Sequence, residues 1–186
     1  MRDFRVAAHA AFPFAGAMRK WYRHHRVRQS FVQGGSFGLT SAIITTLGLM
    51  VGLHSGTHSR LAVIGGIVTI AIADAFSDAF GMHVSQEAGN NNNNGAVDLW
   101  LAAVFVFITK FFLAMTFLVP VLLLDLTVAT LVSVAWGFGL LGAASYWIAR
   151  RQRTEPWKAV GEHFLIGGIV VATNHFVGML VAALHP

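Results

Sequence analysis

Five apolar runs, each close to the length needed to cross a membrane, set the strongest limit on how this chain can fold. They cover residues 34–53, 61–85, 99–119, 122–148 and 163–184. A helix of roughly 20 apolar residues crosses the hydrocarbon core of a bilayer, and a backbone in lipid must satisfy its own hydrogen bonds. Only 11% of the chain is charged, whereas 55% is hydrophobic. The sequence therefore predicts an all-α membrane protein with five transmembrane helices within residues 31–186.

The basic residues predict how these helices are oriented. Of the 13 Lys and Arg residues, most lie either before residue 30 or between Arg150 and Lys158. Basic residues concentrate in the cytoplasmic segments of membrane proteins. We therefore expect a cytoplasmic amino terminus, an outer carboxyl terminus, and a cytoplasmic position for the Asn-rich loop at 86–98. The expected partner is the lipid bilayer and not nucleic acid, although the net charge is +5.

Two shorter segments complete the predicted organisation. Residues 1–30 mix small apolar residues with His and Arg, which is typical of an amphipathic helix lying at the membrane surface. A secretory signal around AFPFAGA is the less favoured alternative. The dipeptide Val119-Pro120 predicts a tight hairpin between the third and fourth spans, because proline interrupts helices. The chain has no cysteine, so disulfides and thiolate metal sites are excluded.

The second span carries the clearest candidate site. Asp74, Asp78 and Met82 recur every four residues, so a helix places them on one face. A carboxylate at membrane depth costs about 2.5 to 3.5 kcal/mol on insertion scales, which makes a functional role in a metal or proton pathway the favoured interpretation. The alternative is a structural one, in which hydrogen bonds or Lys110 in the third span neutralise the aspartates.

A second candidate site lies near the predicted cytoplasmic surface. Glu87 ends the second span, whereas Glu162 and His163 open the last one. These three side chains are a possible loading or release site for a cation. For Glu162, a favourable charge at a helix amino terminus is an equally good interpretation.

The remaining polar residues have structural interpretations. We expect His175, inside the last span, to form an interhelical hydrogen bond. His54 and His58 fall in the predicted outer loop, where a solvated turn is the default. Asp125 is expected to cap the fourth helix or complement its dipole.

Small residues in the first span predict close helix contacts. Gly48, Gly52 and Gly56 recur every fourth residue, a spacing that lets helix backbones approach closely. The pattern alone leaves open whether the partner helix belongs to the same subunit or to another one.

Three stretches resemble the vacuolar iron transporter family. GGSFGLTSAIITTLGLMVGL is similar to a first-helix stretch of that family, AIADAFSDAFGMHVS to its acidic second helix, and LLGA with GEHFLIGGIVVATNHFVG to its end. The resemblance covers about residues 30–184 with the stretches in the same order. It implies a five-helix unit that works as a homodimer and moves Fe²⁺ or Mn²⁺.

Compared with the family pattern residue by residue, this chain retains one acidic position and differs at others. Asp74 matches the second-helix acid, while Asp78 stands where the family has methionine and Met82 where it has glutamate. Phe37 replaces the first-helix aspartate, and the large cytosolic metal-binding insert is missing, as in shorter relatives.

Two functions follow as expectations. The first is transmembrane transport of a divalent cation, Fe²⁺ or Mn²⁺, in exchange for protons along a pathway at a dimer interface, with no covalent cofactor. The second is a non-transporting membrane protein that keeps the fold for assembly or for recruiting a partner. An enzyme is not expected, because the sequence contains no Walker-type loop, HExxH or GxSxG motif.

Overall fold

The computed structural model describes residues 13–88 and 96–184, with side chains from 32–88 and 100–184. All regular structure in these ranges is helical. The helices are α2 (Pro13–Thr57), α3 (Arg60–Ala88), α4 (Ala96–Thr116), α5 (Leu118–Leu123), α6 (Leu126–Gln152) and α7 (Pro156–Leu184).

Five segments within this described part are long and apolar enough to cross a membrane. They are Val32–Thr57, Arg60–Ala88, Trp100–Leu123, Leu126–Gln152 and Pro156–Leu184. The chain is therefore a multi-pass membrane protein, and the five predicted spans are confirmed in number and order. The last span begins at Pro156, earlier than the predicted residue 163, because the helix continues through the polar residues before it.

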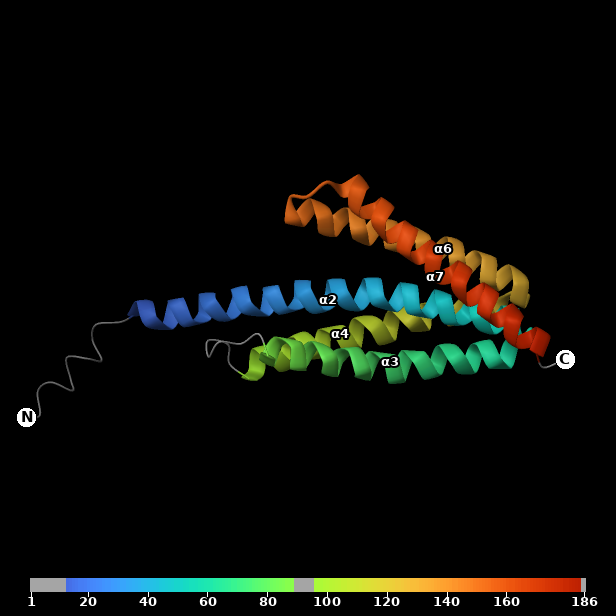
Figure 1. The fold of residues 1–186 in the computed structure, drawn as a ribbon. Coiled ribbons are helices and arrows are strands. Elements are labelled where there is room, and N and C mark those ends of the chain that lie inside the picture. The colour runs from blue at the N-terminus through green and yellow to red at the C-terminus, as the bar shows by residue number, and fades with distance from the viewer. Residues whose placement is uncertain (1–12, 89–95, 185–186) are drawn as a thin grey trace, which may run out of the picture.

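Helix α2 is the centre of the bundle. It contacts α3, α4, α6 and α7, whereas the other long helices pair as α3 with α4 and α6 with α7. Figure 1 shows these two pairs on opposite sides of α2. The main apolar cluster surrounds Ile43, Leu47 and Met50 of α2, so this helix supplies the side chains that the others bury.

The predicted boundary at residue 30 is not a helix end. The helix runs without a break from Pro13 to Thr57, so residues 13–30 belong to the same helix as the first span, which begins at Val32. Gly34 and Gly35 do not interrupt the helix, since no glycine of the described residues has a positive φ angle. Residues 1–12 lie outside the described residues. The amphipathic character of the segment stays a prediction.

The predicted hairpin at Val119-Pro120 is wrong in position. The chain breaks briefly at Phe117, forms α5, and turns only at Leu124 and Asp125. Pro120 lies in the first turn of α5. The N–H groups of a first turn have no acceptor within the helix, so proline costs no hydrogen bond there. The third span therefore ends after Pro120, at Leu123.

The loop predicted at 86–98 is also shorter than expected. Helix α3 extends to Ala88 and α4 begins at Ala96. The intervening residues 89–95, which contain the whole Asn run, lie outside the described residues.

The glycine stripe of α2 packs inside the subunit. A Cβ atom at Gly52 would lie 3.3 Å from the Asn174 carbonyl oxygen, and one at Gly56 would lie 3.1 Å from that of Gly178. At the other end of α2, a Cβ at Gly34 would lie 2.5 Å from the Ala102 carbonyl oxygen of α4. Small residues thus let α2 approach α7 and α4 closely.

Candidate functional site

Two carboxylates and one ammonium group meet between α3 and α4. Lys110 Nζ lies 2.6 Å from Asp74 Oδ2 and also pairs with Asp78 Oδ2. The four-residue spacing on α3 places both aspartates on the face that meets α4. This is the pairing expected from the depth of Lys110 in its span. We call Asp74, Asp78 and Lys110 the charged triad.

Helix α2 adds two hydroxyl donors to the charged triad. Ser41 Oγ donates to Asp78 Oδ2 at 2.8 Å, and Thr45 Oγ1 donates to Asp74 Oδ2 at 3.0 Å. Residues 41 and 45 are also one helical turn apart, and α2 and α3 run in opposite directions, so the two pairs are in register. The sequence pattern of α3 alone did not reveal these partners, because they lie on another helix.

The burial of the triad is uneven. Lys110 is only 2% exposed, whereas Asp74 and Asp78 are 25% and 23% exposed. An unpaired lysine at this depth would be costly, so the two carboxylates are what allow it to be buried. With both carboxylates ionised and Lys110 protonated, the triad has a net charge of −1.

Met82 does not join the charged triad. Its side chain packs against the cluster of Ala79, Ala103 and Val106, and the Gln86 amide lies 3.7 Å from its sulfur. The expected stripe of two carboxylates and a thioether is therefore present along α3, but Lys110 and the α2 hydroxyls complete the polar cluster.

The three residues proposed as a loading site are not brought together. Glu87 is at the end of α3, while Glu162 and His163 are in α7, and Figure 1 shows these helix ends on opposite sides of α2. Glu162 is in the second turn of α7, not the first, so the helix-terminus interpretation is also wrong. His163 Nδ1 contacts the Ala159 carbonyl oxygen at 2.8 Å.

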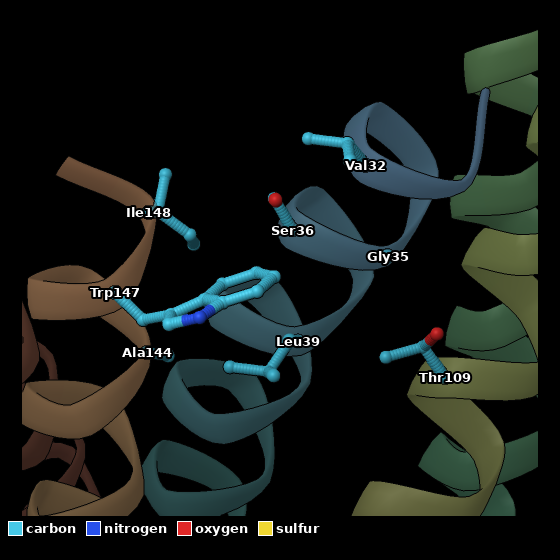
Figure 2. A pocket seen from close by; sticks show the side chains of 8 residues that line it. All are labelled: Val32, Gly35, Ser36, Leu39, Thr109, Ala144, Trp147 and Ile148. Atoms are coloured by element: carbon cyan, nitrogen blue, oxygen red, sulfur yellow. The ribbon is translucent and has the colours of Figure 1, made fainter. Parts of the chain in front are cut away.

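The sequence did not indicate a crevice between α2 and α6. Figure 2 shows the indole ring of Trp147 reaching from α6 towards α2, with Thr109 of α4 on the far side. This apolar cavity has a volume of about 190 Å³. Its lining residues are Val32, Gly35, Ser36, Leu39, Thr109, Ala144, Trp147 and Ile148.

A more polar cavity of about 250 Å³ adjoins the crevice, since Ser36 and Ile148 line both. His163 and Phe37 lie in its wall. The hydroxyls of Thr40, Ser145 and Thr154, which also line it, donate to backbone carbonyls of their own turns. Their oxygens are therefore left as acceptors, so the cavity favours water or another hydrogen-bond donor.

At the opposite end of the bundle, α2 and α7 are joined by a histidine. Ser55 Oγ and His175 Nδ1 are 2.5 Å apart, which confirms the predicted interhelical hydrogen bond. Asp125 occupies the N-cap position of α6, but its side chain forms no capping hydrogen bond. The guanidinium of Arg60 donates to the Leu124 carbonyl at 2.7 Å, linking the two turns at this end.

Among the side chains that the structure describes, those of residues 32–88 and 100–184, no group of three or more His, Asp or Glu is arranged to hold a metal ion. The chain matches no protein-family model and no curated protein.

Proposed function

We propose that the protein is a membrane transporter that exchanges a divalent cation for protons at the charged triad. The observation that carries this proposal is the contact of one buried lysine with two half-buried aspartates. Ionisable groups at membrane depth are expensive and mark ion or proton pathways. Mn²⁺ and Fe²⁺ are the substrates implied by the family resemblance, and carboxylate oxygens suit such cations.

Competition between the cation and Lys110 explains how exchange would work. The triad contacts use the Oδ2 atoms of Asp74 and Asp78, so a cation entering between the carboxylates would meet the Lys110 ammonium. Loss of a proton from Nζ removes this competing charge, and Ser41 and Thr45 keep the carboxylates oriented. Cation release lets Lys110 take up a proton and pair again.

The charge distribution supports the orientation of the transporter. Helix α6 carries Arg150 and Arg151 in its last turn, and Arg153 follows as its C-cap. This end of α6 lies on the same side of the bundle as the start of α2, whose first half carries the basic residues between 13 and 30 (Figure 1). The positive-inside rule then places the amino terminus in the cytoplasm. The two cavities beside α2 are lined by residues near this end of the bundle.

A face of α3 supports a homodimer. Its exposed residues include a small residue at every fourth position, namely Gly65, Thr69, Ala73, Ser77, Gly81 and Ser85. A Cβ atom at Gly65 or Gly81 would meet nothing within 4 Å. Small residues at this spacing let two membrane helices approach closely. A second copy of α3 on this face would bring two charged triads near each other and shield their exposed carboxylates from lipid.

Cysteine crosslinking tests this dimer. Because the chain has no cysteine, Ser77→Cys introduces a single thiol into the proposed interface. We expect oxidation in membranes to give a covalent dimer, while Thr173→Cys on an exposed position of α7 stays monomeric. Equal crosslinking of the two variants, or none for Ser77→Cys, would contradict an α3 interface.

Uptake of Mn²⁺ into proteoliposomes tests the transport proposal. Asp74→Asn and Asp78→Asn each remove one charge, and we expect uptake to fall about tenfold to a hundredfold, as the loss of one charge-assisted contact implies. Asp125→Asn changes an exposed aspartate outside the triad and should keep wild-type uptake. Thermal unfolding of each variant separates lost transport from lost folding. Full uptake by both triad variants would contradict the assignment.

A non-transporting membrane protein is the second candidate, and the 2% exposure of Lys110 favours it. A lysine held permanently by both carboxylates would serve only to hold α3 and α4 together. In that case Mn²⁺ and Fe²⁺ would not raise the unfolding temperature, because only a ligand of the folded state does so. A concentration-dependent rise that Asp78→Asn removes would instead support cation binding at the triad.

A further inference from the structure

We propose that His54 and His58 form a two-imidazole site for a borderline divalent metal ion such as Cu²⁺ or Zn²⁺, at the end of the bundle opposite Arg150, Arg151 and Arg153. This site is independent of the charged triad and of the transport proposed for it. It lies on the last turn of α2 and the residue after it.

The spacing of the two rings fits one shared ion. Their centroids are 5.6 Å apart with a 48° angle between the planes. A metal bound to each ring nitrogen at about 2.0–2.1 Å, with a tetrahedral angle between them, places the centroids about 5 Å apart. The observed centroid separation of 5.6 Å is therefore close to the one that a shared ion requires.

The backbone holds His58 in register with His54. The His58 N–H donates to the His54 carbonyl at 3.1 Å, which continues the helical pattern beyond Thr57. Thr57 Oγ1 donates to the Leu53 carbonyl at 2.7 Å and accepts from the Ser59 N–H at 3.1 Å. This short turn is therefore ordered before a metal binds, which lowers the entropy cost of chelation.

His58 stands where a glycine would be easier to accommodate. Its φ angle is 50°, in the left-handed region. Helices commonly end with glycine in this conformation, because a Cβ atom costs about 1 kcal/mol or more there. A strained conformation of this kind motivates a functional hypothesis for the side chain that adopts it.

The surroundings leave the two rings accessible. His58 is exposed and His54 half-buried, so water can complete the coordination. Arg60 directs its guanidinium to the Leu124 carbonyl at 2.7 Å, and His175 is engaged with Ser55. Imidazole suits Zn²⁺, Cu²⁺, Fe²⁺ and Ni²⁺, and among first-row divalent ions the affinity is lowest for Mn²⁺, next lowest for Fe²⁺ and highest for Cu²⁺. The site therefore prefers metals other than the proposed substrates.

Titration of the purified full chain with Cu²⁺ and Zn²⁺ tests the proposal. We expect His54→Gln and His58→Gly each to weaken binding by at least about tenfold, since even outer partners of metal ligands are worth 10 to 100-fold. The Cu²⁺ resonance spectrum should lose the signature of one of two imidazole nitrogens in each variant.

Two controls make the result decisive. His58→Gly relieves the left-handed conformation, so it should unfold at the same temperature as the wild type or higher, which excludes misfolding as the cause. His163→Gln, at the other end of the bundle, should bind as the wild type does. Unchanged Cu²⁺ and Zn²⁺ binding in His58→Gly, or an absence of two-nitrogen coordination in the wild type, would overturn the proposal.

Discussion

Replacing Lys110 with methionine is expected to lower the free energy of unfolding by about 3–5 kcal/mol, the range for removing one partner of a buried ion pair. Methionine is similar in length and keeps the packing of α4 but supplies no charge. Asp74 and Asp78 would then face each other across one helical turn with only Ser41 and Thr45 as donors. Unfolding of the detergent-solubilised protein, followed by circular dichroism, measures the change.

A triple variant provides the matched control for this result. Adding Asp74→Asn and Asp78→Asn to Lys110→Met removes all three charges together. It should recover most of the lost stability, because replacing a complete buried ion pair is often close to neutral. A triple variant as unstable as Lys110→Met alone would show that packing around Lys110, and not its charge, stabilises the bundle.

Replacing Gly178 with leucine is expected to separate α7 from α2. A Cβ atom at this position would contact the Gly52 carbonyl oxygen and would lie 3.0 Å from both Gly56 N and Ser55 Cβ. Two of these atoms belong to the backbone, which cannot move aside as a side chain can. Overpacking typically costs about 1–3 kcal/mol and occasionally more, and we expect the upper end or beyond.

Gly168→Leu in the same helix is the control. A Cβ there would meet nothing within 4 Å, and leucine is a better helix former than glycine by up to about 1 kcal/mol. The variant should therefore be at least as stable as the wild type. Equal losses for the two variants would show that the helix itself, and not its contact with α2, responds to the substitutions.

The sequence predicted those features that depend on one helix at a time. Apolar length was enough to find five spans, and the spacing of Asp74 and Asp78 was enough to place them on one face. The depth of Lys110 in its span also made its need for acidic partners predictable, because an isolated ammonium in lipid is costly.

The sequence pattern did not predict the contacts that depend on how two helices pack together. Ser41 and Thr45 resemble any other polar residues of α2 until the antiparallel packing of α3 brings the aspartates to them. The stripe of Gly48, Gly52 and Gly56 predicted a close contact but not that its partner would be α7.

The sequence also predicted the ends of the helices poorly. Pro120 suggested a hairpin because proline usually stops a helix, yet the proline lies in the first turn of α5, where it is tolerated. Glu162 looked like the start of a helix because the apolar run starts there, whereas α7 begins at Pro156. Hydropathy predicts the apolar part of a helix that faces lipid, but it does not predict how far the helix continues through the polar residues on either side.

The uneven charge count of the triad has an electrical consequence. Two carboxylates and one ammonium leave a single negative charge, so a divalent ion that replaces one proton on Lys110 carries one net positive charge into the site. Moving one elementary charge across a membrane is worth about 2.3 kcal/mol for every 100 mV. Exchange of one divalent ion for the one proton of Lys110 would therefore generate a current, and its direction and rate would respond to the membrane voltage.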